Sequence, residues 1–183
     1  MQIRISCCHD AKLKQHIKEM TLFVLPKLVK SRPLLLKNVK LYIKTDNKIT
    51  KKEKAWGLCY WRGNPYRPRS FSIYLKTNLS RICITQTYIH ELVHVKQYLL
   101  GELIDYSSGK IKWKKRIYIV TNDEWCDLFS QWEKEAYKIS KSMYLKYYCP
   151  PIIWSQAYVH YFVNIVLYAC KCENNLTYGI YHE

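Results

Sequence analysis

The segment His90-Glu91-Leu92-Val93-His94 is the part of the sequence that decides how the fold and its chemistry are interpreted. Residues four positions apart on an α-helix lie one above the other, so the imidazoles of His90 and His94 can reach one ion about 2 Å away. Glu91 then lies beside that ion. Two imidazoles and one carboxylate leave a fourth position for water, whose pKa falls to about 7 on zinc. The motif therefore predicts a zinc site in which Glu91 takes a proton from the bound water.

The residues around this motif predict that it lies on a helix. Gly101 follows the last apolar pair as a helix stop, and the apolar residues at helical spacing are Tyr88, Ile89, Leu92, Val93, Leu99 and Leu100. With six His and nine Glu in 183 residues, chance would produce such a motif in about one chain in a hundred. The alternative is a structural helix in which both histidines pair with neighbouring polar groups and Glu91 faces water.

A further carboxylate lies 39 positions beyond His94, where the chain contains Trp132-Glu133-Lys134-Glu135-Ala136. Apolar residues recur every three to four positions from Glu124 to about Tyr147 without Gly or Pro, which predicts a second helix. Glu133 and Glu135 are two positions apart and point roughly 160–200° away from each other, so only one of them can face the ion. We expect Glu133 to be the third ligand, and the spacing leaves Glu135 as the alternative.

These segments resemble the small glutamate-zincins, or gluzincin-type metallopeptidases, of bacteriophage and bacterial genomes. The resemblance covers roughly residues 70–140 and rests on residues 90–98, Gly101-Glu102-Leu103, Trp113 and residues 132–136. It implies a minimal zincin-like fold, one Zn²⁺ ion, and peptide-bond hydrolysis. The metal ligands would be His90, His94 and Glu133, and the catalytic base would be Glu91.

The sequence departs from this family at two positions. Tyr137 stands where the family usually has a residue that steadies a metal-bound histidine, so the acidic partner that raises ligand basicity is missing. Gln131 replaces a proline that often precedes the Trp-Glu pair in the phage proteins. Zinc binding is still expected, with Tyr137 as a departure that bears on catalytic strength.

Length and periodicity predict one α+β domain over residues 1–148 and a C-terminal helical extension over residues 149–183. Before the motif we expect a helix from Asp10 to Pro33, kinked at Pro26, and an antiparallel or mixed sheet. The expected strands are 2–6, 39–43, 55–61 and 70–76, followed after the motif by β-structure at 110–120. Residues 71–75 are our candidate for the sheet edge that would hold an extended peptide.

The C-terminal extension contains an almost continuous apolar run, residues 152–170, of about membrane-spanning length. Gln156, His160 and Asn164 recur every four residues and would form a polar stripe on a helix. Such a stripe is costly in a bilayer, which favours packing on the domain or on a partner over membrane insertion. His160 as an additional metal ligand is the less common alternative to a histidine satisfied within its helix.

Positive charge is concentrated in residues 1–70, with 17 Lys and Arg against 4 Asp and Glu, whereas residues 71–183 hold 13 against 10. Cations gain affinity for nucleic acid by releasing counterions from phosphates, and aromatic rings stack on bases. Nucleic acid is therefore a candidate partner, against the alternative of a solvated basic face in a lysine-rich genome. The residues concerned are Lys37, Lys40, Lys44, Lys48, Lys51, Lys52, Lys54, Arg62, Arg67 and Arg69, with Trp56, Tyr60, Trp61 and Tyr66.

The eight cysteines are too sparse for a disulfide scaffold, and no apolar signal segment opens the sequence. Both features favour a reducing, cytoplasmic location, which would be the host cytoplasm for a viral protein. Cys149, Cys170 and Cys172 lack the usual CxxC spacing, so we expect free thiols there rather than a second metal site.

The leading functional hypothesis is a zinc metallopeptidase in which Glu91 deprotonates the bound water and later passes the proton to the leaving amine. Tyr106, Tyr118 and Tyr137 are candidates to stabilise the oxyanion. The alternative is a catalytically weak or inactive zincin-fold protein that uses residues 1–70 to bind nucleic acid or a virion or host component. A third hypothesis combines the two in a protease that is brought to DNA-bound substrates.

Overall fold

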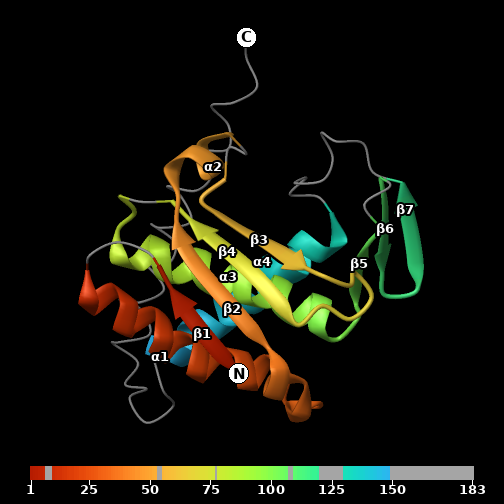
Figure 1. Ribbon diagram of the computed structural model, residues 1–183, viewed down its shortest axis with the longest axis horizontal. Coiled ribbons are helices and arrows are strands. Elements are labelled where there is room, and N and C mark those ends of the chain that lie inside the picture. Colours follow the sequence, from red (N-terminus) through yellow and green to blue (C-terminus); the bar gives the residue numbers. More distant parts are fainter. Residues whose placement is uncertain (7–9, 53–54, 77, 107–108, 120–129, 149–183) are drawn as a thin grey trace, which may run out of the picture. The chain divides into compact units, whose positions relative to one another are not determined.

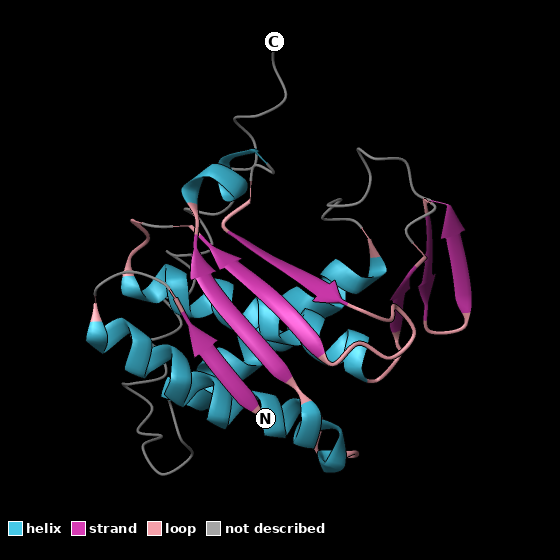
Figure 2. Ribbon diagram, viewed as in Figure 1, coloured by secondary structure: helices cyan, strands magenta, loops and turns pink. Residues whose placement is uncertain are grey.

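The computed structural model describes residues 1–6, 10–52, 55–76, 78–106, 109–119 and 130–148, which form an α+β arrangement as expected (Figure 1 and Figure 2). The chain divides into two compact units, Met1–Tyr147 and Tyr148–Glu183, and the first is described below. The expected C-terminal helix, including residues 152–170, lies outside the described residues. The elements are β1 (Gln2–Ile5), α1 (Ala11–Leu28), the 3-10 helix η1 (Pro33–Asn38), β2 (Lys40–Thr45), α2 (Asn47–Lys52), β3 (Gly57–Arg62), β4 (Ser70–Leu75), α3 (Arg81–Leu99), β5 (Leu103–Asp105), β6 (Lys110–Trp113), β7 (Arg116–Ile119) and α4 (Gln131–Tyr148).

The main sheet has four strands in the order β1-β2-β4-β3. β1, β2 and β4 run parallel, and β3 is antiparallel to β4, so the sheet is mixed. The assignment of residues 71–75 to a sheet edge was wrong, because β4 pairs on both sides and the edges are β1 and β3. Phe71, Ser72 and Ile73 of β4 are all buried, as expected for a central strand with a neighbour on each side.

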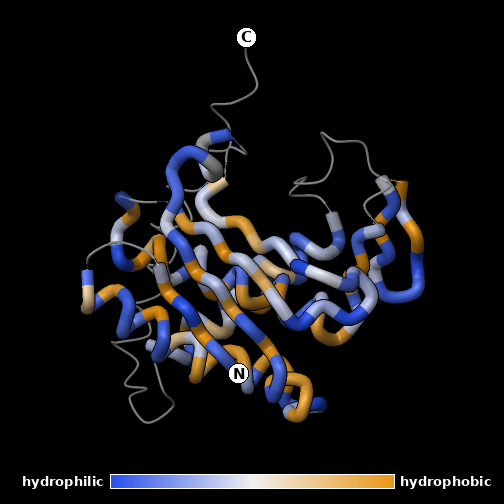
Figure 3. Tube along the Cα trace, viewed as in Figure 1, coloured by the Kyte–Doolittle hydropathy of each residue, from blue (hydrophilic) through white to orange (hydrophobic). Residues whose placement is uncertain are grey.

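Helix α3 packs against β3 and β4 of this sheet, and α1 packs against α3. Apolar residues at alternate positions of β2 and β4 face these helices. Figure 3 shows the same alternation of hydrophilic and hydrophobic residues along β1 and β2. Two buried hydrogen bonds join the helices: Thr21 Oγ1 lies 2.6 Å from Tyr88 Oη, and His16 Nε2 lies 2.9 Å from Thr85 Oγ1. The core formed in this way holds α3 in a fixed position under the sheet.

Two of the expected helix-capping residues, Asp10 and Gly101, are found at helix ends. The Asp10 carboxylate accepts hydrogen bonds from two backbone N–H groups in the first turn of α1, but the helix ends at Leu28, and Pro33 instead begins η1. Helix α3 ends as expected before Gly101, whose φ of +69° is the left-handed conformation that glycine accepts readily. Helix α4 begins at Gln131, and the Ser130 hydroxyl before it accepts a hydrogen bond from the N–H of Glu133. Residues 124–129, where we expected this helix to start, lie outside the described residues.

The expected β-structure after the motif is a small antiparallel sheet in the order β5-β6-β7. Strands β6 and β7 form a hairpin that reverses at Lys114, whose φ is +54°. Leu103, Ile111 and Trp113 are buried on one side of it. Within the described residues, none of the helices combines the length and apolar content needed to cross a membrane.

Candidate metal centre

Helices α3 and α4 bring together the three side chains expected to bind a metal. His90 and His94 lie one turn apart on α3, and Glu133 lies in the first turn of α4. The two Nε2 atoms are 3.0 Å apart, and the Glu133 carboxylate oxygens lie 3.1 Å from Nε2 of His90 and 3.2 Å from Nε2 of His94. Atoms about 3 Å apart can all reach a point about 2 Å from each, which is the length of a zinc–nitrogen or zinc–oxygen bond.

Gln97 determines which nitrogen of His94 faces this point. The Gln97 amide nitrogen donates to the backbone carbonyl of Trp132 at 2.9 Å and to Oε2 of Glu135 at 3.2 Å, so its oxygen must face His94. That oxygen accepts a hydrogen bond from Nδ1 of His94 at 2.9 Å. With Nδ1 protonated, the Nε2 lone pair of a neutral His94 is directed at the cluster, as a metal ligand requires.

The cluster needs a positive charge at its centre because lone pairs converge there. Burial alone would lower the pKa of His94, but the nearby Glu133 carboxylate outweighs burial and raises that pKa to about 9. Burial alone would raise the pKa of Glu133, but the two imidazoles hold it well below its ordinary value. A proton on His94 can supply the charge, and a divalent ion bound at the same point must displace that proton.

Glu135 has a different environment and does not join the cluster. Its carboxylate lies 3.3 Å from Nζ of Lys96 and 3.0 Å from Nζ of Lys114, and Lys96 also pairs with Glu102 at 2.6 Å. These cations and the Gln97 amide lower the pKa of Glu135, although burial opposes them. The geometry therefore separates the two glutamates: Glu133 faces the histidines, and Glu135 ties the start of α4 to α3.

His90 is held differently from His94. Its Nδ1 is buried and has no hydrogen-bond partner among the described residues. The rings of Tyr137 and His90 have centroids 4.6 Å apart, so Tyr137 packs on the imidazole instead of accepting its proton as an acidic residue would. Of the other tyrosines considered for oxyanion stabilisation, Tyr118 packs against Trp132 and Tyr106 against Tyr66.

Glu91 is buried beside the cluster and is held against the edge strand. Its side chain is 4% exposed, and a Cβ atom at Gly57 would lie 2.6 Å from Oε1 of Glu91. Gly57 therefore leaves the space that the carboxylate occupies. Burial raises the pKa of Glu91, while the His90 and His94 imidazoles oppose this shift. A raised pKa is suited to a group that accepts a proton near neutral pH.

The sequence motifs identified the cluster but missed Gln97 and Gly57. Gln97 is three residues beyond His94 and therefore lies on the same helix face, a signal that was available in the sequence. Gly57 had no comparable signal, because its role depends on β3 crossing α3. The described cysteines Cys59 and Cys83 are free thiols, and the Cys149, Cys170 and Cys172 positions lie outside the described residues, as does His160.

Replacing His94 by Ala is expected to abolish stoichiometric metal binding, because it removes one of three converging ligands. The wild-type chain should carry about one divalent ion, measured by elemental analysis after dialysis. His16→Gln is a matched control, since His16 is also buried on a helix but bonds Thr85 outside the cluster. Equal metal content in the His94→Ala and wild-type proteins would contradict the assignment.

The substitution Gln97→Leu is expected to weaken zinc affinity by about 10- to 100-fold, because His94 loses the acceptor that orients its ring. Competition with a chromophoric chelator measures the dissociation constant. Gln15→Leu, which removes an exposed amide paired with Glu19, should leave it unchanged. Unaltered affinity in a folded Gln97→Leu protein would show that His94 is oriented by packing alone.

Comparison with known proteins leaves the site to be interpreted from its own geometry. No protein-family model matches the chain, and no match is found among curated proteins or solved structures. The described residues contain one possible site for a metal ion, formed by His90, His94 and Glu133, and the buried Glu91 lies beside it.

Proposed function

We propose that this protein is a zinc-dependent metallopeptidase with a minimal zincin-like fold. The observation that carries the proposal is the convergence of two Nε2 atoms and one carboxylate within about 3 Å, with a buried second carboxylate on the next residue of the same helix. A structural histidine pair would explain the ion pairs with Glu133. It would not explain why Glu91, which forms no ion pair with any described residue, is buried beside them.

The donor set suits zinc better than the other common divalent ions. Two imidazole nitrogens and one carboxylate are a known ligand set of catalytic zinc, whereas calcium and magnesium prefer oxygen ligands only. When bound, zinc polarises a carbonyl and lowers the pKa of a coordinated water. The protein contributes the remaining steps through its own residues.

Glu91 is proposed as the general base and then the general acid. Its carboxylate accepts a proton from water as the water oxygen bonds to the scissile carbonyl carbon. It then donates this proton to the amide nitrogen as the carbon–nitrogen bond breaks, giving a free amine and a carboxylate product. Tyr137, whose ring packs on that of His90, is our candidate to hydrogen-bond the oxyanion.

The edge strand β3 is proposed to hold the peptide. Among the described strands, β3 pairs only with β4, so its other side would offer backbone N–H and C=O groups to an extended chain. Gly57 at the start of β3 adjoins Glu91, which would bring a peptide on this edge close to the base. This proposal replaces the edge expected at residues 71–75.

Replacing Glu91 by Gln is expected to leave zinc bound and to reduce peptide hydrolysis by about 10²- to 10⁴-fold, because the base is lost and the side-chain shape is kept. Hydrolysis is measured on labelled casein and on a mixed library of quenched peptides, with zinc content determined in parallel. Glu19→Gln, an exposed glutamate on α1, is the matched control. Equal hydrolysis by wild type and Glu91→Gln would favour the alternative of a binding protein without catalysis.

Replacing Gly57 by Ala is expected to reduce hydrolysis with little change in zinc affinity. The added Cβ would meet Oε1 of Glu91 and Cγ2 of Thr87 at 2.6 Å, so the base must move while the metal ligands stay in place. Steady-state hydrolysis and chelator competition on the same preparation separate these effects. Gly63→Ala is a control in which the new Cβ has open space but the φ of +89° is strained. A loss of zinc affinity equal to the loss of hydrolysis would contradict the placement of Glu91.

A further inference from the structure

We propose that the face of the main sheet turned away from α1 and α3 binds single-stranded nucleic acid. This inference does not depend on the proposed peptidase activity. The open sheet face consists of eleven side chains that the strand register places on one side: Gln2 and Arg4 of β1, Lys40, Tyr42 and Lys44 of β2, Ser70, Ser72 and Tyr74 of β4, and Leu58, Tyr60 and Arg62 of β3.

The assignment of these residues to one face follows from alternation along paired strands. In β2, Leu41 and Ile43 are buried toward the helices, so Lys40, Tyr42 and Lys44 point to the other side. Gly57 of β3 adjoins Glu91 of α3, which places the alternating residues Leu58, Tyr60 and Arg62 on the opposite side. Figure 1 and Figure 2 show α1, α3 and α4 behind the sheet, with no described element in front of it.

The register aligns these side chains in rows across the strands. Arg4, Tyr42, Ser72 and Tyr60 form the central row, because Arg4 pairs with Tyr42, Tyr42 with Ser72, and Ser72 with Tyr60. Tyr60 is 42% exposed. The row thus combines a cation and two aromatic rings, separated by a small serine.

Side chains of different strands contact one another across this face. The guanidinium carbons of Arg4 and Arg62 lie 5.8 Å and 5.5 Å from the centroid of the Tyr42 ring. Arg62 comes from β3 and therefore reaches across β4 to Tyr42. The rings of Tyr60 and Tyr74 meet edge to face at 5.8 Å. Bases can stack on tyrosine rings and on guanidinium planes of this kind.

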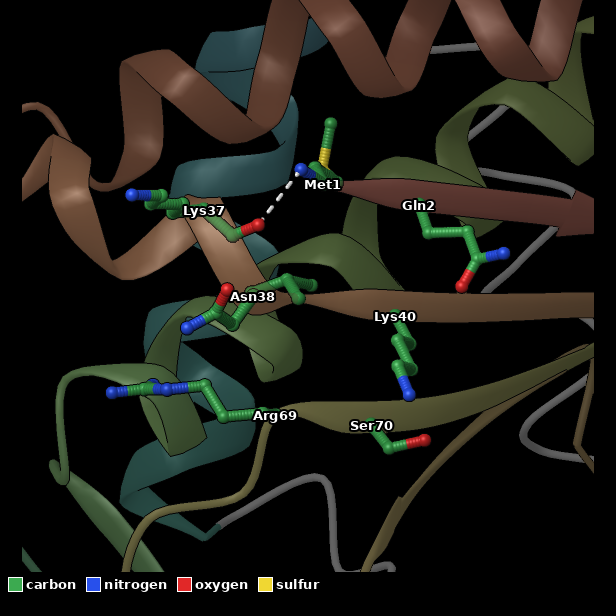
Figure 4. A pocket seen from close by; sticks show the side chains of 8 residues that line it. Met1, Gln2, Lys37, Asn38, Lys40, Arg69 and Ser70 are labelled. Atoms are coloured by element: carbon green, nitrogen blue, oxygen red, sulfur yellow. Dashed lines mark hydrogen bonds between the residues drawn. The ribbon is translucent and has the colours of Figure 1, made fainter.

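The charge of the face suits a phosphate backbone. Four of the eleven residues, Arg4, Lys40, Lys44 and Arg62, are cationic, and none is acidic. Asp46 pairs with Lys44 at 3.3 Å at one end of the face. At the other end lies a hollow of about 620 Å³ whose lining includes Lys37, Lys40 and Arg69. Figure 4 shows Lys37 and Arg69 extending beyond the strand ends at this hollow.

A single strand fits this surface better than a duplex. Tyr42, Tyr60 and Tyr74 lie on a sheet face and can stack only on bases that are not already stacked in a helix. Of the aromatic residues expected from the sequence to stack, Tyr60 lies on this face. Trp61 instead pairs with Phe71 on the helix side. Because the metal cluster belongs to α3 and α4, the open sheet face can be occupied without covering the cluster.

The proposal is tested by fluorescence anisotropy of the full chain with labelled 15-mers of oligo(dT) and oligo(U) and with a 15-base-pair duplex. The single strands are expected to bind more tightly than the duplex, and their relative affinity identifies DNA or RNA as the preferred form. Tyr60→Ala should weaken single-strand binding by at least about five-fold, whereas Tyr60→Phe should retain it, because stacking needs the ring and not the hydroxyl. Arg62→Gln should lower the slope of log K against log salt by about 0.7 to 1.

Lys18→Gln is the matched charge control, because Lys18 is exposed on α1, on the other side of the sheet. Its binding should equal that of wild type, and melting temperatures check that each variant is folded. Three outcomes would overturn the proposal. They are equal affinity for duplex and single strand, equal weakening by Lys18→Gln and Arg62→Gln, and binding to vesicles with anionic lipid but not to either oligonucleotide.

Discussion

The Gln97 amide is the interaction on which the candidate metal centre depends. It accepts from His94 through its oxygen and donates to the Trp132 carbonyl and to Glu135 through its nitrogen. One fully buried side chain therefore orients a histidine on α3 and fixes the residue before Glu133 on α4. Because Gln97 is buried, losing these hydrogen bonds would leave its amide without partners and would lower the stability of the fold by about 1–3 kcal/mol.

Ionic contacts reinforce the same junction. Lys96 is 8% exposed and is paired with Glu102 and Glu135, so its buried charge is compensated from both sides. Lys114 of the β6–β7 turn adds a second cation to Glu135. The turn of the small sheet thus takes part in positioning the first turn of α4. The network explains how a site assembled from two helices keeps its ligands about 3 Å apart.

The sequence predicted most of the helices and strands, because each has its own periodic pattern of apolar residues. It predicted little of the strand order or of the contacts between different elements. Helical spacing identified the helix of His90 and His94. The opposite directions of Glu133 and Glu135 showed that only one of them could join the histidines, and the structure places Glu133 there. Alternation identified the strands. It could not reveal that β4 inserts between β2 and β3, because alternation describes one strand at a time and strand order is set by long-range packing. Gly57 and Tyr42 were missed for the same reason: their neighbours come from other strands or helices.

The register of β4 has a consequence for how the two surfaces of the sheet are maintained. Phe71, Ile73 and Leu75 support the helices, while Ser72 and Tyr74 belong to the opposite side. A slip of one residue would exchange these two sets and place polar groups in the core. A substitution that favoured such a slip would therefore disturb the face that packs on the helix of the candidate metal centre and the cationic face at the same time.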